Sequence, residues 1–432
     1  MSERRRTVYP WRMSAFDLAA IFLVLIGAAG WLNARVLHQP PAAVMVITGL
    51  AGAGLLIAAQ RLLPTPNAAS TFVGGIEAMD FPRTVLGYML AFLLFAGAMQ
   101  VSLPQLRRRL AAVASLATLG VAASTFVVGF GLWIAARALG LELSLPWAFV
   151  FGALISPTDP IAVLAAVRQG NLSKGLEAVL QGEALFNDGV GIVVFFAALT
   201  LATGASDLSP LAVVGQVAVE AIGGLVLGWS AAWVAIRVMR SIDDYAVEVS
   251  LSLALAVGAY ALASALHVSG PIAVVVAGLM VGDCVAKGSA MSETTQRHLQ
   301  GFWTLIDETL NAVLFLLLGL QLLVIPFDAR LAGLWGVAIV LVLLTRVLVV
   351  LPWVTFFHLR HQERGASTLL TWGGLHGALS LAMALSLPPG GAREIVLSTT
   401  FAVVMFSVLV QGLTFGRLAS RIARRQAKAT PD

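Results

Sequence analysis

The chain has 432 residues, of which 59% are hydrophobic and only 11% are charged, and its mean hydropathy is +0.90. Soluble domains are about 45–50% apolar and about 25% charged, so this composition excludes a soluble globular protein and indicates an integral membrane protein. The net charge is +5, but the basic residues lie at the ends of apolar segments, which is a topology signal and not a nucleic-acid footprint. The single Cys284 excludes an internal disulfide and a cysteine metal site.

Apolar runs of about 17–25 residues, long enough to cross a bilayer as helices, recur along nearly the whole chain. They predict an all-α membrane protein with about thirteen transmembrane helices. The predicted spans are residues 15–34, 42–59, 84–102, 110–138, 146–167, 176–203, 209–238, 246–266, 270–287, 302–325, 331–357, 366–388 and 393–417. The first span exceeds the apolar core of a signal peptide, about 7–15 residues, so we expect it to be retained.

The chain divides into an N-terminal tail (1–14), a transmembrane domain (15–418) and a basic tail (419–432). Lys and Arg concentrate on the cytoplasmic side of membrane proteins. Most of them fall on that side if the C-terminus is cytoplasmic, so we predict that orientation, with the tail from Arg417 bound to anionic lipid. Arg4, Arg5 and Arg6 locally favour a cytoplasmic N-terminus, and the side of that end is left open.

Two acidic residues interrupt these apolar spans. Asp159 lies in the Ser-Pro-Thr-Asp-Pro run at 156–160, and Asp188 follows Asn187 in the run at 183–189. A carboxylate in the middle of a bilayer costs about 2.5–3.5 kcal/mol on the lenient insertion scale, so such residues usually face a cavity and act there. The bland alternative is a pair of buried helix caps. We expect an ion site, with Asp188 as the exchanging group and Asp159 as its organiser.

The fifth and twelfth spans occupy corresponding places if the chain is two six-helix halves around a seventh linker helix. The fifth is broken by the prolines around Asp159, and the twelfth by the glycine-rich run at 373–377. Paired interrupted helices predict an inverted-repeat transporter in which the two breaks cross at the ion site. A chance pairing of glycine- and proline-rich stretches is the alternative.

A carboxylate suits the exchange of a proton for a monovalent cation because it can hold either. Protonated it is neutral, and ionised it offers two oxygens to a hard cation. Proton and cation would therefore compete for Asp188. Asn187 supplies a neutral amide that can bond Asp159 or the broken backbone without adding charge.

Three motifs, the runs at 182–189, 156–160 and 371–380, make the chain resemble the electroneutral sodium/proton exchanger family, the NhaP-like monovalent cation:proton antiporters. The resemblance implies that residues 15–418 form a cation/proton exchanger domain, moving like an elevator against a dimerising domain. It implies a metal site for a monovalent cation at Asp188, with Thr158 contributing and with Asn187 and Asp159 interacting. It also implies a homodimer in the cell membrane, the inner membrane if the source is bacterial, and a role in pH and sodium homeostasis.

The chain departs from the family pattern at three positions. Ala96 stands where many members have an acidic residue, and Ala184 where relatives often have a serine. His376 replaces an arginine that, in the family, pairs with the position of Glu183. Because histidine ordinarily titrates near pH 6.5, we expect a pH-sensitive Glu183–His376 pair, and we expect His376→Arg to raise activity at alkaline pH or shift the pH profile.

Other polar residues are weaker candidates. Arg346 is the only Lys or Arg that lies inside a predicted span away from its ends, and the resemblance makes it a counter-charge to the core site. Asp307, at the expected start of the tenth helix, lines the entrance with Asn311 or belongs to a solvated helix end. The substrates expected are Na⁺, or alternatively K⁺ or Li⁺, and H⁺, with no cofactor and no nucleic acid.

The rival functions are an electrogenic or K⁺-selective exchanger and an intramembrane hydrolase. Electrogenic relatives have two adjacent aspartates where this chain has Asn187 and Asp188, which disfavours the first rival. No His-Glu-x-x-His or Gly-x-Ser-x-Gly motif supports the second.

Overall fold

The computed structural model describes residues 14–62, 68–159, 174–204, 210–288, 291–325, 328–357 and 365–429. These residues are helical or irregular, with no β-strand among them, and one isolated β-bridge joins Asp159 to Leu375.

The α-helices are α1 (Ala15–Leu32), α2 (Pro41–Leu62), α3 (Ala68–Ala78), α4 (Leu90–Met99), α5 (Leu103–Arg108), α6 (Leu110–Ser115), α7 (Val121–Ala138), α8 (Leu145–Ile155), α10 (Lys174–Thr203), α11 (Pro210–Met239), α12 (Tyr245–Ala265), α13 (Gly270–Lys287), α14 (Glu293–Leu320), α15 (Ala332–Phe356), α17 (Ala366–Trp372), α18 (Ala378–Leu385), α19 (Gly391–Phe406) and α20 (Leu413–Ala429). Short π-helical segments η1 (Asn33–Leu37), η2 (Arg83–Met89), η3 (Leu116–Gly120) and η6 (Ser407–Gly412) and 3₁₀ turns η4 (Gln321–Leu323) and η5 (Ala329–Leu331) extend some of them.

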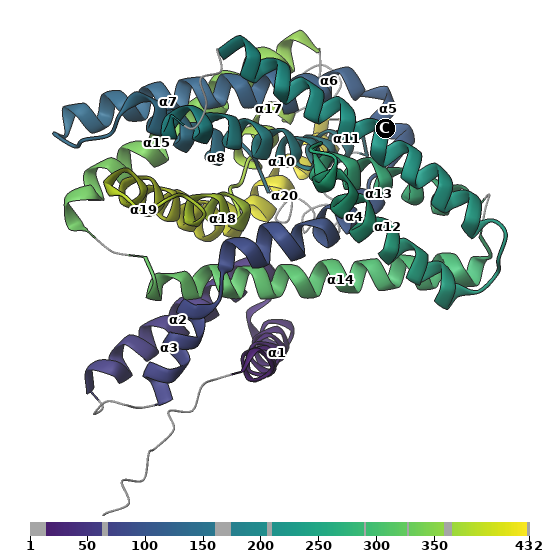
Figure 1. Ribbon diagram of the computed structural model, residues 1–432, viewed down its shortest axis with the longest axis horizontal. Coiled ribbons are helices and arrows are strands. Elements are labelled where there is room, and N and C mark those ends of the chain that lie inside the picture. Colours follow the sequence, from purple (N-terminus) through teal and green to yellow (C-terminus); the bar gives the residue numbers. More distant parts are fainter. Residues whose placement is uncertain are drawn as a thin grey trace, which may run out of the picture.

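The helices form two bundles. The first bundle contains α1, α2, α4, α11, α12, α13 and α14, which pack mainly on one another. The second bundle contains α7, α8, α10, α15, α17, α18 and α19. Figure 1 shows α14 running across the molecule below α4, with α1, α2 and α3 beneath it and with α7, α15, α18 and α19 above it on the left. The bundles meet mainly where α10 touches α11 and α13, where η6 touches α2, and where α18 touches η2 and α14.

The packing of the first bundle repeats when the two halves of the chain are exchanged. The second span packs on the tenth (α2 on α14), and the ninth packs on the third (α13 on α4). Glycines allow both close approaches: a Cβ on Gly319 would lie 2.8 Å from the backbone N of Leu50, and one on Gly278 would lie 2.7 Å from the carbonyl O of Phe95. Small residues at such crossings let two backbones meet, as membrane helix pairs require. The pattern is that of two inverted repeats, as predicted.

Each of the thirteen predicted spans contains helix. Ten helical stretches in the described residues are long and apolar enough to cross a membrane, residues 83–99 and 145–155 are shorter apolar helices, and α17 with α18 is interrupted. The chain is therefore a multi-pass membrane protein, while thirteen crossings stay a prediction. The predicted residues 160–167 of the fifth span, and residues 1–13 of the N-terminal tail, lie outside the described residues.

One predicted boundary is wrong. The tenth span was expected to begin at residue 302, but α14 begins at Glu293, where Ser292 caps it by accepting a hydrogen bond from the Thr295 N–H at 3.3 Å. Hydropathy detects only the part of a helix that lies in lipid, whereas the helix itself continues into polar residues. Asp307 consequently lies in the middle of α14 and not at its start.

Candidate functional site

The first break begins just before Pro157, in the run at 156–160 where it was predicted. α8 stops at Ile155, and the Ser156 hydroxyl donates to the Gly152 carbonyl at 2.6 Å, which partly satisfies the last turn. Pro157 has no N–H to continue the helix, so the chain is irregular from there to Asp159. Pro157 lies so close to Gly191 of α10 that any Cβ at 191 would overlap its ring.

The second interrupted helix crosses the first at Asp159. The Asp159 N–H donates to the Leu375 carbonyl at 2.6 Å, midway between the end of α17 and the start of α18. The Asp159 side chain lies against Gly377, the N-cap residue of α18, where an added Cβ would come within 2.9 Å of the Asp159 Cγ. A carboxylate at a helix N-terminus faces the positive end of the helix dipole. Asp159 therefore joins the two breaks, and its negative charge offsets the positive end of the helix dipole at the start of α18.

Arg346 occupies the opposite end of the second break. Its Nε donates to the carbonyl of Leu370, in the last turn of α17, at 3.1 Å. Its two terminal nitrogens bond both carboxylate oxygens of Glu183, Nη2 to Oε2 at 2.9 Å and Nη1 to Oε1. The Arg346 and Glu183 side chains are only 11% and 2% exposed, so this is a buried bidentate ion pair.

The expected Glu183–His376 pair is wrong, because Arg346 occupies the Glu183 carboxylate. His376 instead joins the two breaks: its Nδ1 donates to the carbonyl of Pro157 at 3.1 Å, and its backbone N–H donates to the Ser407 hydroxyl at 2.8 Å. Ser407 opens the π-helical segment η6 and donates in turn to Gln411 at 2.8 Å. His376 is buried and serves as a backbone tie.

Asn187 bonds the broken backbone, as one of its two predicted roles required. Its Nδ2 donates to the Thr158 hydroxyl at 2.8 Å, and its Oδ1 accepts from the Thr158 N–H at 3.3 Å. Both groups are buried. A backbone N–H left bare at this depth would be costly, so the amide replaces the helical partner that the break removed.

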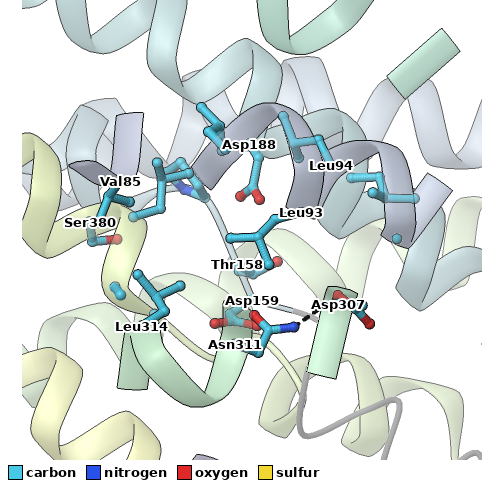
Figure 2. Close-up of a pocket in the computed structure, with 17 residues that line it drawn as sticks. Val85, Leu93, Leu94, Thr158, Asp159, Asp188, Asp307, Asn311, Leu314 and Ser380 are labelled. Atoms are coloured by element: carbon cyan, nitrogen blue, oxygen red, sulfur yellow. Dashed lines mark hydrogen bonds between the residues drawn. The ribbon is translucent and has the colours of Figure 1, made fainter. Parts of the chain in front are cut away.

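Asp188 faces a cavity at this crossing. Figure 2 shows the carboxyl groups of Asp188 and Asp159 reaching toward the cavity from different elements, with Thr158 drawn between them. About 80 Å³ there is open to water, several times the roughly 10–15 Å³ that one water needs. Asp188 lies one position after Asn187 on α10, and it lines the cavity together with Asp159. We call this space the central cavity.

The remaining wall of the central cavity comes from the first bundle. Asp307 and Asn311 of α14 line it together with apolar residues of α4. Ala96 and Ala184 are both buried and contribute no side-chain oxygen, so the departures from the family pattern persist in the structure. Gln100, whose side-chain amide donates a hydrogen bond to Asp307, could not be predicted from the sequence. A single polar residue at the end of a helix gives no sign of such a contact.

The geometry defines a class of protein: a membrane transporter whose ion site lies where two interrupted helices cross, with opposite charges at their ends. Comparison with known proteins names the family. Residues 20–421 match the model of a protein family that is described as "Sodium/hydrogen exchanger, transmembrane". The chain belongs to this family and is a transporter, not an enzyme.

Relatives span nearly the full chain. The Na⁺/H⁺ antiporter NhaP of Pseudomonas aeruginosa is 40% identical over 419 residues, covering 94% of this chain and 96% of that protein. The Na⁺/H⁺ antiporter NhaH of Halobacillus aidingensis is 37% identical over 393 residues, covering 88% and 91%. The solved sodium proton antiporter MjNhaP1 of Methanocaldococcus jannaschii matches with a TM-score of 0.70 at 20% identity, covering 95% of this chain and 100% of that one, and so shares its fold.

Proposed function

We propose that the protein exchanges one Na⁺ for one H⁺ across the membrane, with the Asp188 carboxylate holding proton and cation in turn. The observation that carries this proposal is the position of Asp188 on a water-sized cavity at the crossing of the two interrupted helices. The names of the relatives support Na⁺ as the cation, and K⁺ and Li⁺ are the alternatives.

The oxygens around the central cavity suit a hard cation. Asp188 offers a carboxylate, and Asp159 and Thr158 line the same space. The Thr158 hydroxyl accepts one hydrogen bond from Asn187 and keeps a second lone pair for a cation. We propose that Asp159 and Thr158 complete the cation site around Asp188.

The neutral Asn187 favours one-for-one exchange over electrogenic exchange. Its amide bonds the hydroxyl and the backbone N–H of Thr158, and it adds no second titrating group beside Asp188. When one cation moves against one proton, the membrane potential drops out and each unit of pH gradient supplies about 1.4 kcal/mol. Such a carrier would serve pH and sodium homeostasis.

We propose that the second bundle moves relative to the first during transport. The central cavity lies between the bundles, with Asp159 and Asp188 on one side and Asp307 on the other. Contacts across this boundary are sparser than those within each bundle, so sliding disrupts less packing than bending a helix. Glu183 and Arg346 travel together in the second bundle as a fixed ion pair.

A homodimer and a cytoplasmic C-terminus complete the proposal. α11 exposes a run of large apolar side chains, among them Trp229 and Trp233, that suits lipid or a second copy of the chain. α20 carries Arg417, Arg421 and Arg424 on a helix with one apolar and one basic side, as expected at a cytoplasmic membrane surface.

The test is a dye-based ΔpH assay in everted membrane vesicles with Na⁺, Li⁺ and K⁺. Asp188→Asn should abolish cation-induced dissipation of the pH gradient, because an amide cannot exchange a proton for a cation. In the wild type, lowering the pH should raise the Na⁺ concentration needed for half-maximal exchange, since the proton competes. Exchange at the wild-type rate by purified Asp188→Asn protein in proteoliposomes would refute the role of Asp188.

A further inference from the structure

A second and larger cavity lies at the end of α4, beside α13 and α14. It is lined by residues 99–104, by Gly282, Asp283, Ala286 and Lys287 of α13, and by Gln300, Trp303 and Thr304 of α14. The Lys287 ammonium pairs with the Asp283 carboxylate at 2.6 Å. About 540 Å³ of it is open to water, which is room for a hydrated ion. We call it the vestibule.

The two cavities follow one another along the same helices. On α14 the vestibule ends at Thr304 and the central cavity begins at Asp307, and on α4 the central cavity reaches Gly97 while the vestibule begins at Met99. At 1.5 Å per residue, each step is less than one helical turn. The two cavities are therefore neighbours along both helices, and Asp307 lies at the edge of the central cavity that is nearer the vestibule.

Asp307 is held in place at this junction. Gln100, which lines the vestibule, donates from Nε2 to Asp307 Oδ2 at 3.0 Å and to the Ala96 carbonyl at 3.3 Å. Asn311, which lines the central cavity, donates from Nδ2 to Asp307 Oδ1 at 2.9 Å, the dashed contact in Figure 2. Both carboxylate oxygens thus accept hydrogen bonds, the arrangement that suits an ionised carboxylate.

Asp307 lines the central cavity together with Asp159 and Asp188, but it comes from α14, whereas Asp188 comes from α10 and Asp159 follows α8. It also belongs to the first bundle, whereas those two belong to the second. Asp307 is buried, with only 6% of the residue exposed.

We propose that Asp307 is a second cation-binding residue, one that receives a monovalent cation from the vestibule before it reaches Asp188. Gln100 and Asn311 hold the Asp307 carboxylate in place between the two cavities. In this chain, where residue 96 is alanine, α14 supplies the acidic group at the mouth of the cavity. The inference rests on the proposed exchange function and concerns the path, not the exchanging group.

The experiment measures the Na⁺ concentration for half-maximal exchange from each side of the membrane, in everted and in right-side-out vesicles. Asp307→Asn should raise it about tenfold when Na⁺ is added on the vestibule side and leave it unchanged from the other side, with an unchanged maximal rate. Asp307→Glu, which restores the charge, should return it to within a few-fold of wild type. Glu308→Gln, which removes the same charge from the exposed next position of α14, is the matched control and should have no effect.

Three results for Asp307→Asn would overturn the proposal. The Na⁺ concentration for half-maximal exchange could stay within twofold of wild type, it could rise equally from both sides of the membrane, or only the maximal rate could fall. If Asp307→Asn does not assemble in the membrane, Gln100→Leu is the second variant, because it keeps the Asp307 carboxylate but removes the hydrogen bond from Gln100. Its Na⁺ concentration for half-maximal exchange from the vestibule side should rise about threefold. An unchanged concentration would contradict the proposal. If the wild-type protein shows no Na⁺-dependent exchange, the proposed function itself is refuted.

Discussion

Removing the Arg346 guanidinium should destabilise the protein more than any other single change to the ion site. Arg346→Met leaves the Glu183 carboxylate, only 2% exposed, without its partner. Breaking a buried ion pair in this way costs about 3–5 kcal/mol. The same change removes the donor to the Leu370 carbonyl, worth about 1–3 kcal/mol more. We therefore expect a loss of at least about 4 kcal/mol in unfolding free energy.

A double variant separates the ion pair from general damage. In Glu183→Gln/Arg346→Met no buried carboxylate is left unpaired, so the double variant should be more stable than Arg346→Met alone. Tryptophan fluorescence during thermal unfolding of the purified protein in detergent measures the order of the variants. Arg330→Met, which removes an exposed arginine near the start of α15, is the control and should unfold close to wild type. Costs that simply add in the double variant would refute the reasoning.

Two further changes test the crossing. Gly377→Ala should abolish exchange, because its methyl group would overlap the Asp159 carboxylate, whereas Gly391→Ala, at the start of α19 with open space around it, should exchange normally; equal activity of the two variants in the vesicle assay would contradict this. His376→Arg should lower the yield and thermal stability of the protein without a shifted pH profile, because a second guanidinium would share the small cavity that His376 and Arg346 line. A stable variant with a displaced pH optimum would show that the histidine does more than tie the backbone.

The positions of the breaks and of the two central aspartates could be predicted because their signals are local. Pro157 and the glycines from Gly373 to Gly377 interrupt helices wherever they stand, and an acidic residue in an apolar span is conspicuous. The structure confirms the break after α8, the break between α17 and α18, and their crossing at Asp159.

The partner of Glu183 could not be predicted in the same way. The motif position of His376 predicts a pair with Glu183, yet Arg346, 163 residues from Glu183 in the chain, forms the ion pair. Both candidates lie far away in the chain, and no spacing rule distinguishes them. Only the packing of the second bundle, in which α15 lies against α7 and α17, brings Arg346 to the Glu183 carboxylate on α10.

By itself the sequence determined that the chain spans a membrane repeatedly, where two helices break, and that Asp159 and Asp188 lie within apolar spans. These features could be predicted because hydropathy and helix breaks depend on neighbouring residues alone. Only the tertiary structure decided which charges neutralise each other and that Asp307 faces the same cavity as Asp188. The physical reason is that a buried charge is satisfied by whatever long-range packing places beside it, which chain order does not encode.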